Sequence, residues 1–143
     1  MPSIVAQIPA APSDVALAHF ELRLSLETDC SDVYESMRAA EGPDFVLIDT
    51  RGRASYARAH VPGAVSLPHR EMTAERLAVY PADTLFVVYC NGPHCNAADR
   101  GAARLARHGR KVKVMIGGMA GWADEGFAVV QGEEPGAATA SAA

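Results

Sequence analysis

The continuous apolar run from Leu85 to Tyr89 constrains the fold of this chain more than any other segment. A run of Val and aromatic side chains without polar alternation is typical of a strand that is covered on both faces. Shorter apolar runs at 45–48, 64–67 and 112–116 have the same character, and helix-like segments separate them. Because strands and helices alternate, the sequence predicts an α/β fold with a mostly parallel sheet and helices on both faces.

The remaining elements follow from periodicity and from turn residues. The segment from Phe20 to Leu26 alternates apolar and polar residues, which predicts a half-buried strand and brings the sheet to five strands. Asp29 and Ser31 are suitable N-cap residues for the helix that follows. Further helices are predicted at 53–60, 71–77 and 97–108, with a short one around Trp122.

A length of 143 residues is typical of a protein with a single domain. Residues 1–18 carry three prolines and neither Lys nor Arg, so we expect a flexible arm without helix or strand. Residues 132–143 are small and polar, which is typical of a disordered tail. The folded domain is therefore predicted to span 19–131.

Composition excludes several classes of protein. A net charge of -4 and a pI of about 5.7 argue against a nucleic-acid binder. There is no apolar run near the ~20 residues that cross a bilayer. The N-terminus lacks the charged and apolar regions of a secretory signal, so we expect a cytoplasmic protein without membrane contact. Three cysteines are too few for the disulfide framework of a small secreted protein. In a reducing compartment one of them is a candidate for a reactive thiol.

Cys90 is the best candidate for that reactive thiol. It directly follows the strand at 85–89, and a loop with Gly92 and Pro93 leads from it into the helix at 97–108. Ligands of parallel sheets bind at the carboxyl ends of strands. Loop N–H groups and the first turn of a helix can surround the sulfur and favour its thiolate. From this pattern alone, sulfur chemistry, a phosphatase, a redox loop and a buried core cysteine all remain open.

An ordered set of short motifs resembles the rhodanese-like domain family. Each motif alone is weak, but the set in this order is specific. It consists of Leu47-Ile48-Asp49-Thr50-Arg51, Tyr56-Ala57, His60-Val61-Pro62-Gly63-Ala64, Leu67-Pro68, Val88-Tyr89-Cys90 and Ile116-Gly117-Gly118-Met119-Ala120-Gly121-Trp122.

The resemblance implies a rhodanese-like fold and a sulfurtransferase that uses thiosulfate or a persulfide. Cys90 falls on the family's nucleophile, which would hold the sulfur as a persulfide and pass it to cyanide or a thiol. Backbone N–H groups of 91–96 would cradle the anion. No metal or organic cofactor is implied. The candidate substrate-binding residues are Asn91, Gly92, Pro93, His94, Cys95, Asn96 and Arg100.

The loop departs from the family pattern in its charge and in its apparent length. The loop holds Asn91, His94 and Asn96 where relatives often carry Arg or Lys, which favours a less charged donor than thiosulfate. Asn96 also replaces the arginine of the Cys-x5-Arg loop of related phosphatases, and this removes their bidentate phosphate ligand. Leu105 and Gly109 come about two positions later than usual, which suggests a longer loop.

Residues near Cys90 have alternative interpretations. Cys95 either resolves an oxidised Cys90 or fills the inner face of the loop. His94 and Arg100 either contact an anion or are solvated surface residues. Asp49 and Arg51 are interpreted as a supporting ion pair, with a site-lining role for Asp49 as the alternative.

Other singled-out residues have structural interpretations. His60 is predicted to hydrogen-bond the backbone in a turn, Trp122 to pack in the core near the Cys90 loop, and Cys30 to be inert. Zinc sites need four ligands, usually in two pairs, and the second pair is missing. A basic stretch is a solvated helix face or a docking surface for an acidic protein partner; it comprises Arg104, Arg107, His108, Arg110, Lys111 and Lys113.

The predicted function is sulfur transfer through a Cys90 persulfide, with small-molecule donors and acceptors. Two alternatives stay open: a non-catalytic binding or regulatory module, and a redox switch of Cys90 and Cys95. The chain is expected to be a monomer or a weak homodimer.

Overall fold

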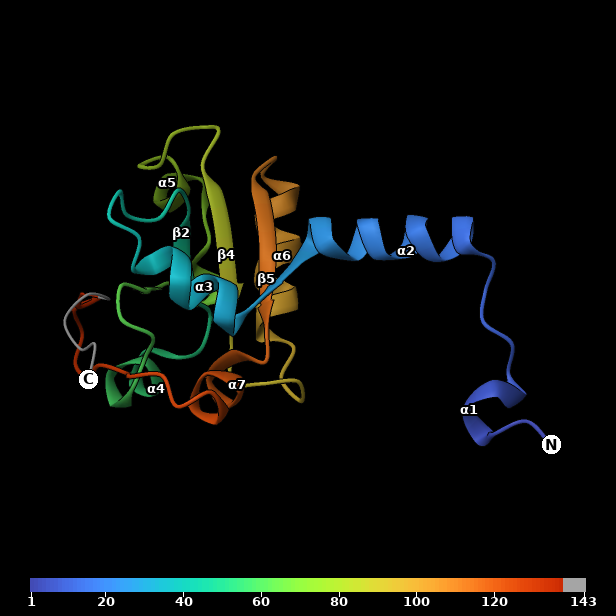
Figure 1. Ribbon diagram of the computed structural model, residues 1–143. Coiled ribbons are helices and arrows are strands. Elements are labelled where there is room, and N and C mark those ends of the chain that lie inside the picture. The colour runs from blue at the N-terminus through green and yellow to red at the C-terminus, as the bar shows by residue number, and fades with distance from the viewer. Residues whose placement is uncertain (138–143) are drawn as a thin grey trace.

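The computed structural model describes residues 1–137. Its centre is a five-stranded, fully parallel sheet in the order β1-β5-β4-β2-β3 (Figure 1). The α/β fold with five parallel strands is confirmed. The strands are β1 (Glu27–Asp29), β2 (Val46–Asp49), β3 (Val65–Ser66), β4 (Leu85–Tyr89) and β5 (Lys111–Ile116). The α-helices are α1 (Ile4–Gln7), α2 (Ser13–Leu26), α3 (Cys30–Met37), α4 (Arg53–Arg58), α5 (Ala74–Leu77), α6 (Ala97–Arg107) and α7 (Gly118–Asp124), and His69–Glu71 forms a 3-10 turn.

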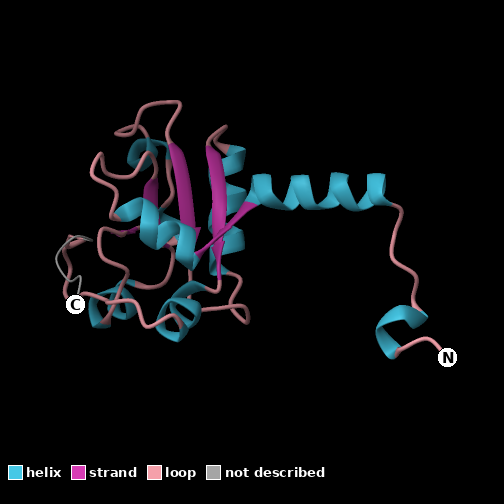
Figure 2. Cartoon of the chain, viewed as in Figure 1, coloured by secondary structure: helices cyan, strands magenta, loops and turns pink. Residues whose placement is uncertain are grey.

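Helices cover both faces of the sheet, as predicted (Figure 2). Alternate side chains of β4 enter two different core clusters, because successive residues of a strand point to opposite faces. Val87 and Tyr89 pack with residues of α3, α4 and α7. Phe86 and Val88 pack with residues of α5 and α6. Burial on both faces explains why the sequence of β4 is continuously apolar.

The carboxyl ends of the central strands meet at one edge of the sheet. Asp49 of β2 is paired with Tyr89 of β4, and Val88 of β4 is paired with Val114 of β5. Cys90 therefore leaves the sheet at the edge where ligand sites of parallel sheets lie.

The predicted strand from Phe20 to Leu26 is wrong, because this segment belongs to helix α2. Leu, Ala, Glu and Arg are strong helix formers, and their propensity prevails over the alternating pattern. The first strand is instead β1, which pairs with β5 at the edge of the sheet.

The expectation that 1–18 lacks helix is also wrong. Ile4–Gln7 is helical, and α2 begins at Ser13 directly after Pro12. Pro12 is the N-cap residue of α2, so its ring interrupts no backbone hydrogen bond inside the helix. The division of the chain at residue 18 remains a prediction.

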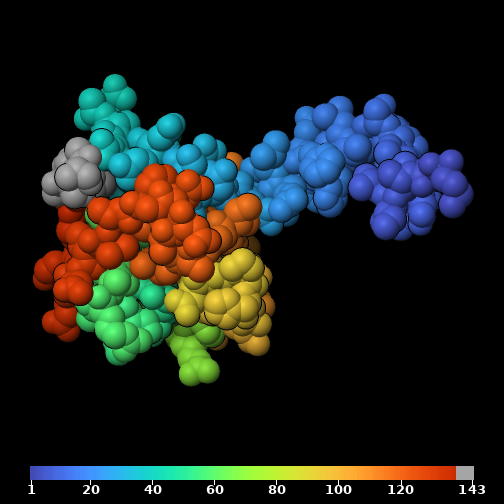
Figure 3. Space-filling model, turned by 60° about the horizontal axis from the view of Figure 1, so that its bottom comes forward, coloured from blue at the N-terminus to red at the C-terminus, as the bar shows by residue number. Residues whose placement is uncertain are grey.

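Helix α2 extends away from the rest of the chain (Figure 3). It contacts β1 and β5, and none of its residues is buried. Its apolar side chains do not gather on one face of the helix. Six of them are more than half exposed, namely Val15, Leu17, Phe20, Leu22, Leu24 and Leu26.

The described part of the predicted tail contacts the domain. The N–H of Gly132 donates to the Ala57 carbonyl at 2.8 Å, and the N–H of Gly63 donates to the Pro135 carbonyl at 2.8 Å. Ordered contacts thus extend into residues 132–135, whereas residues 138–143 of the predicted tail lie outside the described residues. None of the helices within 1–137 is both long enough and apolar enough to span a bilayer.

Candidate active site

Cys90 lies between the end of β4 and the start of α6. Its side chain belongs to the core cluster beneath α6, and the residue is only 4% exposed. The Sγ atom donates to the Cys95 carbonyl at 3.2 Å. The backbone N–H groups of Ala98 and Gly92 are directed at this sulfur. Of the amides predicted at 91–96, Gly92 is the one directed at the sulfur, and the second donor, Ala98, comes from the first turn of α6.

The prediction that the surroundings of Cys90 favour its thiolate is wrong, because the pKa of this thiol is raised. Burial raises the pKa of Cys90, and the two backbone N–H groups offset that rise only in part. Removal of the thiol from water disfavours its charged form. Sequence reasoning identified the amides but not the degree of burial.

Cys95 is the more acidic thiol of the pair. The N–H groups of Ala97 and Asn91 lower the pKa of Cys95. Burial raises it, but this effect is smaller. The side chains of Cys95 and Cys90 are neighbours, and their interaction lowers the pKa of Cys95 and raises that of Cys90.

Helix α7 binds the Cys90 loop through backbone hydrogen bonds. The N–H of Met119 donates to the Cys90 carbonyl at 3.0 Å, and the N–H of Ala120 donates to the Asn91 carbonyl at 2.8 Å. Gly118 has a φ of +56°, and a Cβ at this position would collide with the Cys90 carbonyl oxygen. Only glycine permits this close approach of the two backbones.

A cavity of about 410 Å³ opens beside the Cys90 thiol. We call it the Cys90 pocket; its lining residues are Arg23, Glu27, Cys90, Gly92, Pro93, Cys95, Ala98, Asp99 and 114–118. Three predicted substrate-binding residues therefore share the pocket with Cys90: Gly92, Pro93 and Cys95. Sequence reasoning missed the charged residues Arg23, Glu27 and Asp99. Arg23 was missed because its segment was interpreted as a strand of the sheet.

The other predicted substrate-binding residues do not line the Cys90 pocket. Asn91, His94 and Asn96 line a more open cavity of about 500 Å³ on the outside of the loop. Arg100 lines neither cavity, and its Nε donates to the Asn96 Oδ1 at 3.3 Å.

Asp49 and Arg51 form the predicted ion pair. Nη2 of Arg51 lies 2.7 Å from Oδ2 of Asp49, and the Asp49 side chain is fully buried. Nη2 of Arg51 also donates to the Ala59 carbonyl at 2.6 Å. The pair thereby ties the end of β2 to the segment after α4, which supports the structural interpretation, since neither residue lines the Cys90 pocket.

The structural interpretations of His60, Trp122 and Cys30 agree with their contacts. His60 is buried with its ring nitrogens against the backbone carbonyls of Tyr56, Glu134 and Pro135. Trp122 is 2% exposed, and its Nε1 donates to the Ala128 carbonyl at 2.9 Å. It belongs to the core cluster on the opposite face of the sheet from Cys90. Burial raises the pKa of Cys30 to about 11, which keeps this thiol protonated.

The basic stretch is not one uniform surface. Arg110 donates to the carbonyls of Pro81, Leu77 and Tyr80, and its guanidinium lies over the Phe86 ring. Arg110 therefore connects the segment after α5 to β4. The docking of an acidic partner on the basic stretch remains a prediction.

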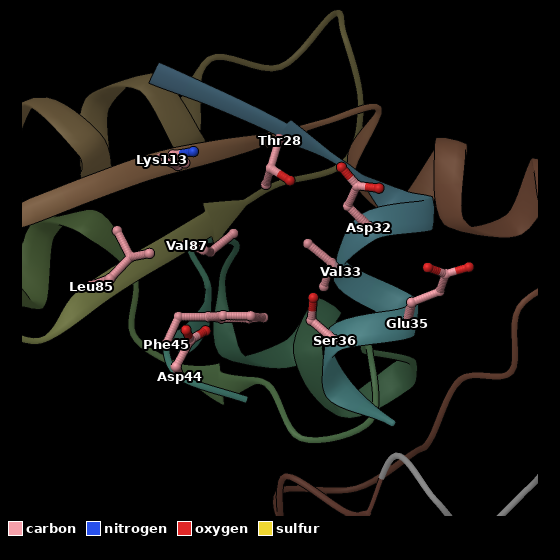
Figure 4. Close-up of a pocket in the computed structure, with 10 residues that line it drawn as sticks. All are labelled: Thr28, Asp32, Val33, Glu35, Ser36, Asp44, Phe45, Leu85, Val87 and Lys113. Carbon is pink, nitrogen blue, oxygen red and sulfur yellow. The ribbon is translucent and has the colours of Figure 1, made fainter. Parts of the chain in front are cut away.

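A separate cavity of about 320 Å³ lies between α3 and the sheet (Figure 4). Carboxylates of Asp32, Glu35 and Asp44 and the ammonium of Lys113 line it, and it holds no thiol. Within residues 1–137, no three His, Cys, Asp or Glu side chains gather in a way that fits a metal ion.

Comparison with known sequences identifies the family. The sequence model of the rhodanese-like domain matches residues 32–125, which is more than half of the chain. The chain belongs to the rhodanese-like domain family. This rhodanese-like domain includes β2, β4, β5 and the Cys90 loop.

Known proteins resemble this rhodanese-like chain to different extents. An HTH-type transcriptional regulator of Mycobacterium tuberculosis is 37% identical over 125 residues, which cover 87% of this chain and 54% of the regulator. The chain thus spans about half the length of this curated relative. A crystal structure of a Bacillus halodurans protein has a TM-score of 0.80 and 28% identity, and the match covers 91% of this chain and 92% of that one. The thiosulfate sulfurtransferase of Pseudomonas aeruginosa has a TM-score of 0.65 and 22% identity over 78% of this chain and 21% of its own, and this likeness shows the fold alone.

Proposed function

We propose that this protein is a sulfurtransferase that carries sulfur on Cys90. The observation that carries the proposal is a thiol at the carboxyl end of β4 that borders an open cavity while two backbone N–H groups point at its sulfur. The same amides stabilise negative charge on the outer sulfur of a persulfide. Membership of the rhodanese-like family supports this assignment.

The reaction proceeds as two displacements at sulfur. The Cys90 thiolate attacks the outer sulfur of the donor, the sulfur–sulfur bond of the donor breaks, and the donor leaves as its thiolate or sulfite. An acceptor such as cyanide or a thiol then attacks the outer sulfur of the Cys90 persulfide, and Cys90 leaves as a thiolate. Because burial raises the pKa of Cys90, its thiol must lose its proton before the attack, and the N–H groups of Ala98 and Gly92 ease this loss by stabilising the thiolate.

Mass spectrometry of the intact protein tests this proposal. After incubation with a sulfane-sulfur donor, the wild-type chain should gain about 32 Da for each sulfur bound. Cys90→Ser should show no gain, whereas Cys95→Ser should load to the same extent as the wild-type chain. An equal gain on Cys90→Ser refutes the assignment.

A redox switch is the second candidate, and the closeness of the two cysteines favours it: both line the Cys90 pocket, and the Cys90 Sγ lies 3.2 Å from the Cys95 carbonyl oxygen. Two-electron oxidation by peroxide would join the two sulfurs as a disulfide with loss of both thiol protons, while peroxide is reduced to water. The protein would then lose about 2 Da, and an added thiol would restore it. If mild peroxide yields no such species, this candidate is removed.

A non-catalytic regulatory module is the third candidate, because the relative from Mycobacterium tuberculosis is named a transcriptional regulator. A module that only binds would show no transfer of sulfur from Cys90 to an acceptor. Loss of the added mass from loaded Cys90 when cyanide is supplied separates the two functions.

A further inference from the structure

The Cys90 pocket contains a charged group that the loop itself does not supply. Arg23 lies in the last turn of α2, and it is the only cationic residue among the described residues that line the pocket. Its Nε is 2.8 Å from Oε1 of Glu27, which also lines the pocket. Asp99 of α6 adds a second carboxylate to the wall.

The ion pair between Arg23 and Glu27 can open to bind a ligand. The Arg23 side chain is 53% exposed and that of Glu27 34% exposed. An exposed ion pair of this kind contributes only about 0–1 kcal/mol, so partner exchange with a charged ligand costs little. Arg23 lies in the last turn of α2 and Glu27 begins β1, so the short backbone segment between them keeps both residues beside the pocket when the ion pair opens.

The charges of this wall select one type of donor. Thiosulfate brings two negative charges to a wall with one cation and two carboxylates, and like charges at short range repel. The persulfide of an α-amino-acid thiol carries a carboxylate and an ammonium beside its reactive sulfur. These two groups complement an arginine with adjacent carboxylates, and a cavity of about 410 Å³ is large enough for such a ligand.

We propose that the Cys90 pocket binds the persulfide of an amino-acid thiol, with Arg23 on its carboxylate and Glu27 on its ammonium. This inference rests on the proposed sulfur transfer and names the donor class. In the transfer step, the Cys90 thiolate takes the outer sulfur, the sulfur–sulfur bond of the donor breaks, and the amino-acid thiolate leaves.

Four freshly prepared donors with the same reactive group test the two contacts separately. Cysteine persulfide has both charged groups, N-acetylcysteine persulfide only the carboxylate, cysteine methyl ester persulfide only the ammonium, and mercaptoethanol persulfide neither. KM should be lowest for cysteine persulfide and highest for mercaptoethanol persulfide. A lower KM for thiosulfate than for cysteine persulfide overturns the proposal.

Two substitutions should shift KM in different patterns. Arg23→Gln should raise KM about tenfold for the two donors with a carboxylate and change it less than about twofold for the ester. Glu27→Gln should raise KM for the ester, but it should lower KM for N-acetylcysteine persulfide because it releases Arg23. An equal shift for all four donors means that the substitutions act on the fold, and the proposal is then wrong.

Arg76→Gln is the matched control. The Arg76 side chain is also 53% exposed and lies 3.5 Å from Glu71, but it does not line the Cys90 pocket. This variant should leave all four KM values unchanged, and a shift equal to that of Arg23→Gln contradicts the proposal.

A binding titration separates failure of this inference from failure of sulfur transfer. S-methylcysteine has both charged groups and no reactive sulfur, so NMR can follow its binding to Cys90→Ser. The site is supported if S-methylcysteine binds near the Cys90 loop and Arg23→Gln removes this binding, even when no donor loads Cys90. Absence of binding overturns the site, whether or not persulfide forms on Cys90.

Discussion

Helices α6 and α2 both border the Cys90 pocket, but the rest of the structure constrains them very differently. Helix α6 buries Ala98, Gly101 and Leu105 against the sheet, and its first turn presents an N–H group to the Cys90 sulfur. Helix α2 buries no residue and contributes only the charged side chain of Arg23. The comparison shows that the thiol and the amide of α6 directed at it belong to the packed core, whereas the arginine that lines the pocket sits on a peripheral helix.

The largest effect on sulfur transfer is expected from a substitution of Cys90, which lies directly before α6. Cys90→Ser should abolish steady-state formation of thiocyanate from a sulfane-sulfur donor and cyanide, because the hydroxyl cannot carry the sulfur. Colorimetric assay of thiocyanate measures this. Residual turnover of Cys90→Ser close to that of wild type would move the chemistry to another residue.

A matched pair of leucine substitutions measures how differently the two helices are anchored. Leu105→Ala on α6 removes a fully buried side chain and should lower the free energy of unfolding by about 2–5 kcal/mol. Leu22→Ala on α2 changes a side chain that is 60% exposed and should alter it by no more than about 0.5 kcal/mol. Urea denaturation checks both values. Equal losses for the two variants would mean that α2 is packed in solution, and the comparison would fail.

The two thiols should differ in reactivity. At neutral pH, limited iodoacetamide should label Cys95 before Cys90, because the thiolate fraction of Cys95 is raised by its lowered pKa. The labelling rate of Cys90 should rise with pH above the range of an ordinary thiol, since burial raises its pKa. Cys95→Ser should speed the labelling of Cys90 at neutral pH, because it removes the neighbour that raises the Cys90 pKa. Peptide mapping follows each site, and faster labelling of Cys90 in the wild-type chain contradicts this ordering.

The smallest effect is expected at Arg100. This residue lies on α6 near Cys90 in sequence, but it does not line the Cys90 pocket. Arg100→Gln should change kcat/KM for cysteine persulfide by less than about twofold. A loss as large as that of Arg23→Gln would show that the cation acting on the donor comes from α6.

Much of the fold follows from the sequence because its central strands are buried on both faces. The bounds of β4 and the position of Cys90 after it could be derived from one apolar run. The parallel direction of the strands followed from the alternation of strands and helices. At Phe20–Leu26 a period of two competed with strong helix propensity, and no local signal in the segment decided between them.

The same error hid part of the candidate site. Arg23 and Glu27 have the i, i+4 spacing of an ion pair on a helix, but this spacing has no meaning in a strand. The pKa direction of Cys90 was also beyond sequence reasoning, because it depends on how completely α6 and the loop cover the sulfur. Amide donors can be inferred from a strand–loop–helix pattern, whereas burial requires the packed structure.

A single-turnover experiment tests the central claim most directly. The protein is loaded with cysteine persulfide, freed of excess donor, and mixed with cyanide, and thiocyanate is measured together with the mass of the Cys90 peptide. The account predicts about one thiocyanate for each loaded chain, with loss of about 32 Da from that peptide. Thiocyanate formed without a change at the Cys90 peptide, or a persulfide that cyanide leaves in place, would contradict it.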